Sequence, residues 1–461
     1  MASAAPEPWT ETDEDEYGVT PKLVRDVREA LEAGDTARVR ALVDDLHAAD
    51  LADLLGELET EERYALVEAM GSELDPQVLP ELDGAIRDQI VAYLQPEDLA
   101  AAVQELDTDD ALEVVADLDE DQREALLARL PEADRLVIEQ GLTYPERTAG
   151  RLMQRELVAI PAFWTVGETI DFMRVSPTLP DDFYDIFVVD PRHRPIGTIP
   201  LSRILRNRRP VTIGDIMDSD LRPIPVSMDQ EEIAFLFRQQ DLVSAPVVDD
   251  TGRLVGVITI DDVVDVIDEE AEEDIMKLSG ALEHDVHAPA LKTVRRRQSW
   301  LVVTLINTIL ASLVISRFER SIEELVALAV LMPIVAAMGG NAGMQLVTVV
   351  VRALATKDLT SGNALRIVRK ELLIGLMNGI VFAAIMSTIA IVWFGHPGLG
   401  AVLAGAMIIN MVWAALAGTL IPLLLSKAGI DPAIAAGPFL TTTTDVLGFL
   451  VFLGLATLVL L

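Results

Sequence analysis

The stretch TTTTDVLGF, Thr441 to Phe449, places a single aspartate inside the last apolar run of the chain. No other side chain from Ile434 to Leu461 carries a charge. At about 1.5 Å of rise per residue, Asp445 would lie roughly 18 Å from Ala433 in a helix, near the middle of a bilayer core about 30 Å thick. An ionised group is costly at that depth, so Asp445 is the first candidate for a functional residue.

Five long apolar segments follow Arg297, and each approaches or exceeds the roughly 20 residues that cross a bilayer as a helix. They run from about Trp300 to Ser316, Leu325 to Leu354, Leu372 to Phe394, Ala401 to Leu425 and Ala433 to Leu461. The pattern predicts an integral membrane protein with a five-helix transmembrane domain over residues 295–461. The beginning of the chain is acidic and lacks an apolar core, so we expect residues 1–19 to be disordered and to contain no signal peptide.

Basic residues indicate which ends of the spans face the cytoplasm. Three arginines at 295–297 precede the first span, and the connection between the third and fourth spans offers only His396. Five bases lie between the second and third spans: Arg352, Lys357, Arg366, Arg369 and Lys370. Because positive charge gathers at cytoplasmic ends, we expect a multi-pass protein of the plasma membrane with its N-terminal half in the cytoplasm and its C-terminus outside the cell.

The net charge of the 461-residue chain is −38, and it is unevenly distributed. From Arg295 onward there are seven acids and eleven bases, a net of +4, so residues 1–294 carry −42. So acidic a soluble half repels nucleic acid and would attract cations, although a well-solvated surface also explains it. The chain has no cysteine, which excludes disulfides and thiolate zinc sites. We find no nucleophile–base pair, phosphate loop or catalytic metal spacing, and therefore expect no enzyme.

Each span contains an amide or acid that lipid would disfavour. These residues are Asn307, Asn341, Asn378, Asn410 and Asp445. Interhelical hydrogen bonds would account for most of the asparagines. Every Lys and Arg in this half lies at a span end or in a connection, so we expect the partner of Asp445 to be an ion from solution.

The second span reads PIVAAMGGNAGMQ, Pro333 to Gln345. Gly339 and Gly343 form a Gly-x-x-x-Gly face, which by itself is a common helix-packing motif. Pro333 and the two glycines at 339 and 340 also weaken the helix, and freed carbonyls are tolerated at membrane depth where they line a watery cavity. Asn341 and Gln345, four residues apart, share one helix face.

Residues 20–147 contain a repeat with a period of 12. The residues in register are Leu46, Leu58, Met70, Leu82, Leu94, Leu106, Leu118 and Leu130. An acid follows each of several leucines, as in LDTDDALEVVADL, and precedes an apolar helical face. The repeat predicts an all-α superhelical solenoid of short helices. Acids at the helix starts, including Asp109 and Asp110, are explained mostly by helix capping.

Residues 148–268 contain a second repeat, in which FVVDPRHRPIGTI (Phe187 to Ile199) corresponds to PVVDDTGRLVGVI (Pro246 to Ile258). This repeat resembles tandem α/β CBS modules, at 148–211 and 212–268, which often bind adenine nucleotides. Nucleotide-binding modules carry Thr-x-x-Asp after the second strand. The second copy has Thr259 and Asp262, whereas the first has Pro200 and Arg203. The resemblance therefore allows at most one nucleotide site, with ATP as the candidate ligand.

An acidic connecting segment, predicted over 269–294, joins these modules to the first span. On the helix that leads into it, Asp262, Asp265 and Glu269 share one face. Glu270, Glu273 and Asp274 form another acidic group. Like charges so arranged destabilise a helix unless cations bridge them. An exposed charged connector is the alternative.

With this domain order, Gly-Gly-Asn-x-Gly-x-Gln in the second span and Thr-Asp-Val-x-Gly-Phe in the fifth, the chain resembles MgtE-type magnesium channels over nearly its whole length. The resemblance implies a homodimer with one central pore for Mg²⁺, and other divalent cations are candidate partners of the same pore. Asp445 matches the acid that recognises the ion, and Asn341 matches the polar motif that lines the cavity. We add Gly340, Thr441 and Thr444 as candidate pore residues, although threonine hydroxyls often bond to their own helix.

The resemblance also implies that the connecting helix is a plug, which closes the pore when internal magnesium occupies acidic sites. The matching positions are Asp241, Asp262, Asp265, Glu270, Glu273 and Asp274. Magnesium keeps much of its water and prefers one or two carboxylates, so two copies of Asp445 across a twofold axis would suffice. The alternatives are a proton- or sodium-coupled divalent-cation exchanger and a membrane-anchored nucleotide sensor.

Overall fold

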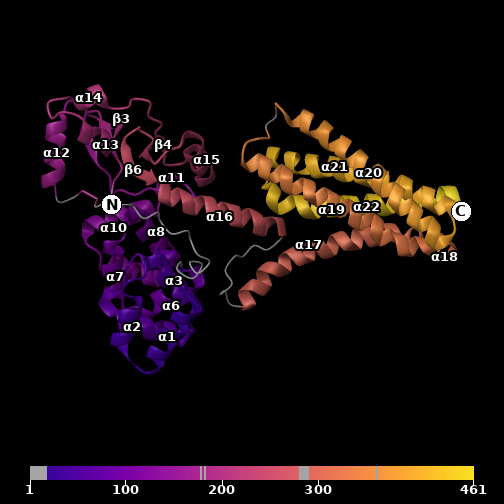
Figure 1. The fold of residues 1–461 in the computed structure, drawn as a ribbon, viewed down its shortest axis with the longest axis horizontal. Coiled ribbons are helices and arrows are strands. Elements are labelled where there is room, and N and C mark those ends of the chain that lie inside the picture. The colour runs from indigo at the N-terminus through magenta and orange to yellow at the C-terminus, as the bar shows by residue number, and fades with distance from the viewer. Residues whose placement is uncertain (1–17, 177–178, 181–182, 280–289, 360–361) are drawn as a thin grey trace, which may run out of the picture. The chain divides into compact units, whose positions relative to one another are not determined.

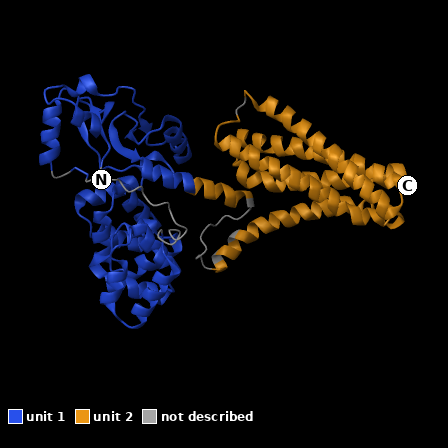
Figure 2. Ribbon diagram, viewed as in Figure 1, with its two compact units in different colours: residues 1–268 blue, residues 269–461 orange. Residues whose placement is uncertain are grey.

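The structure is a computed structural model that describes residues 18–176, 179–180, 183–279, 290–359 and 362–461. The chain divides into two compact units, residues 1–268 and 269–461 (Figure 2). Nearly all of the acidic N-terminus predicted at 1–19, and residues 280–289 of the predicted plug, lie outside the described residues.

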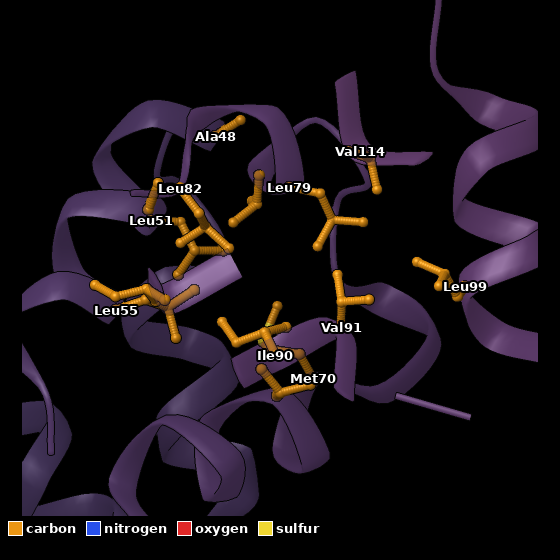
Figure 3. Packing of buried hydrophobic residues seen from close by; sticks show 14 of the residues in the cluster. Ala48, Leu51, Leu55, Met70, Leu79, Leu82, Ile90, Val91, Leu99 and Val114 are labelled. Atoms are coloured by element: carbon orange, nitrogen blue, oxygen red, sulfur yellow. The ribbon is translucent and has the colours of Figure 1, made fainter. Parts of the chain in front are cut away.

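The first part of the first unit is entirely helical, as the 12-residue repeat predicts (Figure 1). Its helices are α1 (Pro21–Glu32), α2 (Thr36–Val43), α3 (Ala48–Glu57), α4 (Thr60–Met70), the 3₁₀ turn η2 (Gly71–Glu73), α5 (Val78–Glu81), α6 (Gly84–Tyr93), α7 (Pro96–Glu105), α8 (Thr108–Asp117), α9 (Glu120–Leu127) and α10 (Glu132–Gly141). Leu58, Leu106 and Leu118 each end a helix with an extended backbone and point into the core. Figure 3 shows Leu51, Leu55 and Leu82 side by side in that core.

The rest of this unit contains two three-stranded sheets, β1-β2-β3 and β4-β5-β6. Its elements are α11 (Ala149–Leu152), β1 (Ala159–Pro161), α12 (Val166–Val175), β2 (Asp185–Val189), β3 (Pro195–Pro200), α13 (Leu201–Arg206), α14 (Ile213–Ile216), β4 (Ile224–Pro225), α15 (Gln230–Gln240), β5 (Ser244–Val248) and β6 (Leu254–Thr259). In each sheet the first pair is parallel and the second antiparallel, with the same irregularity after Val188 and Val247. The two sheets confirm the tandem α/β modules.

The segment before each module packs on the sheet of the other module. A side chain at Gly256 of β6 would lie 2.7 Å from the carbonyl of Gln154 and from the sulfur of Met153. Gly197 of β3 makes the corresponding approach, 2.7 Å from the carbonyl of Asp218 and 2.8 Å from the sulfur of Met217. The glycines in β3 and β6 therefore each admit a Met-containing segment that precedes the other module.

Helix α16 (Ile260–Ser279) begins in the first unit and ends in the second. The other helices of the second unit are α17 (Ala290–Ser316), α18 (Glu319–Glu324), α19 (Ala327–Ala355), α20 (Ala364–Phe394), α21 (Pro397–Lys427) and α22 (Pro432–Leu460). Five of these, α17 and α19 to α22, are long and apolar enough to cross a membrane, which confirms the predicted spans. They pack alongside one another, with α21 between α20, α19 and α22 (Figure 1).

The helices extend beyond the apolar segments. Arg366, Arg369 and Lys370, predicted in a connection, lie in the first two turns of α20, and Arg352 lies in the last turn of α19. Hydropathy detects only the part of a helix that lies in hydrocarbon, so the charged ends of a span escape it.

Candidate ion pathway and regulatory sites

Asp445 lies in the middle of α22 with a half-buried side chain. Within the described part of the chain its carboxylate makes no hydrogen bond or ion pair. Two helix contacts bracket its depth in the bundle. A side chain added at Gly343 of α19 would lie 2.8 Å from the side chain of Leu440 on α22. Side chains added at Gly339 of α19 and Gly448 of α22 would both meet the same residue of α21.

The same contacts place Asn341 at the level of Asp445, because it lies between Gly339 and Gly343 as Asp445 lies between Leu440 and Gly448. The Gly-x-x-x-Gly face is thus a packing face. Helix α19 remains continuous through Pro333, Gly339 and Gly340, so the predicted weakening does not unwind it in this structure.

One face of α19 has an unusual composition for a membrane helix. Between residues 333 and 348 its exposed residues are Pro333, Ala337, Asn341, Gln345 and Thr348, all small or polar. On α20, by contrast, most of the exposed residues between 373 and 385 are large and apolar; they include Leu373, Met377, Val381 and Ile385. Only the second kind of face suits lipid.

The three other candidate pore residues differ in their positions. Gly340 is half-buried, and an added side chain there would meet no atom within 4 Å. Thr441, also half-buried, donates its hydroxyl to the Gly437 and Pro438 carbonyls, both at 3.2 Å. Thr444 is fully buried within the chain and donates to the Leu440 carbonyl at 3.0 Å. The threonine oxygens thus keep only acceptor capacity for other partners.

In the first unit, three carboxyls from two distant parts of the chain come together. Asp109 and Asp110 begin α8, and Asp262 lies in the first turn of α16. Burial and then the neighbouring Asp262 raise the pKa of Asp109 well above its ordinary value and that of Asp110 to about 7. Burial raises the pKa of Asp262 to about 6, although hydrogen bonds to the hydroxyl and amide of Thr259 oppose the shift.

More acids surround these three carboxyls. Burial and neighbouring acids also raise the pKa values of Glu81, Asp107 and Asp265. Glu156 accepts hydrogen bonds from the Thr108 hydroxyl at 2.7 Å and from its amide at 3.3 Å, which holds the start of α8. Asp109 and Asp110 lie in the first turn of α8, as a role at the helix start requires, but their burial beside Asp262 is a further feature that the sequence did not indicate. A bound cation would lower the electrostatic cost of keeping these partly buried carboxylates charged and close together.

In the second unit, the end of α16 contacts the start of α22. The Nζ atom of Lys277 lies 2.7 Å from Oε1 of Glu273 and 2.9 Å from Oδ2 of Asp431. Burial and the nearby Asp431 raise the pKa of Asp274. Leu278 packs against the buried apolar cluster of the bundle that includes Val347 and Leu440. Sequence reasoning missed Lys277 and Asp431, since a lone base at a helix end and a helix cap carry no functional signal.

The other predicted regulatory positions are more dispersed. Asp241 is exposed and ends α15 in a left-handed conformation, and Glu270 is half-buried on α16. Within the residues that the structure describes, no three acids or histidines lie close enough to hold a metal ion. An ion that keeps most of its water would need only one or two of them.

Three family models match the chain: an MgtE intracellular N domain at 46–147, a CBS domain at 213–269 and an MgtE divalent cation transporter domain at 332–455. The magnesium transporter MgtE of Thermus thermophilus is 33% identical over 95% of this chain and 99% of its own length. The Bacillus subtilis magnesium transporter MgtE is 28% identical over 93% and 95%. Among solved structures, the cytosolic domain of the Mg²⁺ channel MgtE in complex with ATP is 32% identical and covers 53% of this chain and 99% of its own, with a TM-score of 0.49.

Proposed function

The chain belongs to the MgtE family of magnesium transporters, and we propose that it is a homodimeric magnesium channel in which two copies of Asp445 bind a hydrated ion on a shared axis. It is a multi-pass membrane protein with an intracellular N-terminal domain. Five spans that follow an intracellular domain leave the C-terminus outside the cell, and the bases at the ends of α19 and α20 agree with that orientation.

The composition of the α19 face is the observation that carries the proposal. Asn341 and Gln345 are exposed on a membrane helix whose other exposed central residues are small. Lipid cannot satisfy two amides, and a second copy of the chain would enclose them around water. Asp445 lies at the same depth and also lacks a partner in the described chain. A twofold axis beside α19 would bring two carboxylates and two amides to one cavity.

The chemistry of this cavity suits a hydrated dication. Magnesium dehydrates reluctantly and usually keeps several waters, so ligands that accept hydrogen bonds from those waters can hold it. Two carboxylates supply the opposite charge, and the Thr441 oxygen and the Asn341 amide can accept from the water shell. Loose binding of an intact hydrated ion also allows release, which conduction requires.

We further propose that internal magnesium closes the pore through the acidic sites. Burial is the main cause of the raised pKa values of Asp109, Asp110 and Asp262, and nearby acids add to it, so the charged forms of these carboxyls are costly without a cation. A dication would neutralise this group and favour the compact arrangement of the soluble half. Helix α16 continues from this group to Lys277 and Leu278 at the end of the bundle, so a change at its start can act on the plug.

One ATP site, at the second module, remains part of the proposal. The Thr259 hydroxyl donates to Asp262 at 2.7 Å, so a ribose or phosphate group would have to displace that bond. We expect Thr259→Val to weaken ATP binding in calorimetry without altering ion flux at zero ATP. Equal affinity in the variant would remove this site from the proposal.

Magnesium flux into proteoliposomes tests the main proposal. Asp445→Asn keeps the shape of the side chain and removes its charge, and we expect it to lower flux at least about 100-fold, the loss of roughly 3 kcal/mol expected for one carboxylate per subunit. A variant that conducts like wild type would refute the pore. Clamping the proton and sodium gradients separates a channel from a coupled exchanger, because only the exchanger follows those gradients.

A further inference from the structure

Asn410, in the middle of α21, is a fully buried amide in the membrane domain. Its Nδ2 atom donates to the backbone carbonyl of Val335 on α19 at 2.9 Å. Its Oδ1 atom is buried and has no hydrogen-bond partner within the described residues. An unpaired buried acceptor costs free energy, so packing and stability alone do not explain an amide at this position.

Two glycines on different helices make room for this amide. A side chain added at Gly339 of α19 would collide with Asn410, lying 2.9 Å from its Cγ atom and closer still to Nδ2. One added at Gly448 of α22 would lie 3.0 Å from the same Nδ2 atom. The amide is thus wedged between α19 and α22, at two points where neither helix can carry a larger residue without displacing it.

These two glycines lie next to the proposed pore residues. Gly339 is two residues before Asn341 on α19, and Gly448 is three residues after Asp445 on α22. A side chain that fixes the separation of the two glycines also fixes the separation of the helix turns that carry the amide and the carboxylate. A hydrated ion is recognised by the spacing of the groups around it, so small changes in that separation alter selectivity.

We propose that Asn410 is a positioning residue for ion selectivity, which sets the spacing of Asn341 and Asp445 by holding α19 and α22 apart through Gly339 and Gly448. It acts through these neighbours and does not touch the ion. The inference rests on the proposed roles of Asn341 and Asp445.

The test is a mutant cycle on the full-length protein in proteoliposomes, with flux measured per folded dimer. The variants are Gly339→Ala, Asn410→Ala and their combination, with Asp445→Asn as the reference for a blocked pore. Gly454→Ala is the matched control, because an added side chain at Gly454 on α22 meets nothing within 4 Å. If Gly339→Ala does not yield folded protein, Gly448→Ala replaces it, since its contact is less severe.

We expect Gly339→Ala to lower magnesium flux about tenfold. The double variant should have the same flux as Asn410→Ala alone, because Asn410→Ala removes the side chain with which the added methyl group collides. We expect Asn410→Ala alone to lower the ratio of magnesium to calcium flux by about tenfold, with wild-type amounts of folded dimer. Loss of packing alone would lower the amount of folded protein and leave that ratio unchanged.

Two results would overturn the inference: a magnesium-to-calcium ratio in Asn410→Ala within about twofold of wild type, or independent, multiplying effects of the two substitutions in the cycle. If either result is found and Asp445→Asn still does not conduct, only the proposed role of Asn410 is refuted. Wild-type conduction by Asp445→Asn removes the proposed pore itself, so the two failures are distinguishable.

Discussion

The ammonium of Lys277, near the end of α16, lies 2.9 Å from the carboxylate of Asp431, the residue that caps α22 by accepting a hydrogen bond from the amide of Ala433. Burial opposes its charge, but hydrogen bonds to Glu273 and Asp431 raise the pKa of Lys277. Because α22 carries Asp445, one charged side chain joins the proposed plug to the helix that would bind the ion.

This relationship predicts a weaker plug in Lys277→Met. The substitution removes the ammonium group that lies between Glu273, Asp274 and Asp431. The three carboxylates then repel one another, so the plug should leave the bundle more readily at low magnesium. A partly buried pair of charged hydrogen bonds contributes about 1 kcal/mol, which corresponds to a roughly fivefold rise in the internal magnesium needed for half-inhibition. Saturating magnesium should still inhibit fully, since the ion can replace the ammonium. Flux at graded internal magnesium measures the shift.

The matched control for this variant is Lys427→Met. Lys427 is exposed at the end of α21 and makes no ion pair within the described residues. It should keep the wild-type half-inhibitory concentration. If both lysine variants shift alike, the effect comes from net charge, and the Lys277–Asp431 contact has no role in seating the plug.

The carboxyls of Asp110 and Asp262 predict how the stability of the metal-free protein depends on pH. Their folded pKa values, about 7 and about 6, exceed the ordinary value of 3.8. The folded state therefore holds protons that the unfolded chain releases. The stabilisation is complete below about pH 4 and is lost as the pH rises through 6 and 7. We expect the thermal midpoint in chelator to fall between pH 5 and 8, and magnesium to restore it at pH 8.

Asp110→Asn should abolish most of this fall, because it removes the charge that burial penalises. At pH 8 we expect it to stabilise the metal-free protein by about 2 to 4 kcal/mol and to reduce the stabilisation by magnesium. Asp121→Asn, an exposed acid in the first turn of α9, serves as the control. A fall of equal size in Asp110→Asn and wild type would assign the pH dependence to other groups.

Much of the architecture follows from local patterns. The spans were predictable because length and hydropathy suffice to define a membrane helix. The solenoid was predictable because leucines of the repeat such as Leu58, Leu106 and Leu118 both end a helix and enter the core. The α/β modules were predictable because the strand–turn–glycine–strand pattern occurs twice.

Contacts between distant segments were not predictable in this way. Nothing near Asp109 indicates that Asp262 will lie beside it, since acids at a helix start are ordinary caps. Met153 belongs by sequence to the first module but packs on the second sheet. Asn410 looked like any of the four membrane asparagines. Only the two glycines facing it distinguish it, and they lie on other helices.

The contrast between two exposed asparagines gives a direct test of the pore face. Asn341 lies on the small and polar face of α19, and Asn378 on the large apolar face of α20. We expect Asn341→Leu to lower magnesium flux about tenfold, because it replaces a group that faces water with one that repels it. Asn378→Leu, in contact with lipid, should conduct like wild type. Equal losses in the two variants would place the water-filled path elsewhere.

Neutralising the acids of α16 should uncouple the channel from internal magnesium. Asp262→Asn, Asp265→Asn and Glu273→Gln together remove the repulsion that a bound ion would otherwise relieve. Magnesium then binds the closed and open states equally well and cannot shift the channel toward the closed state. We expect the variant to keep its flux at an internal magnesium concentration that lowers wild-type flux tenfold or more. The control removes the same number of charges from exposed positions on α9, with Glu120→Gln, Asp121→Asn and Glu124→Gln. Inhibition that survives in the α16 variant, or is lost equally in the control, would show that net charge or another site closes the pore.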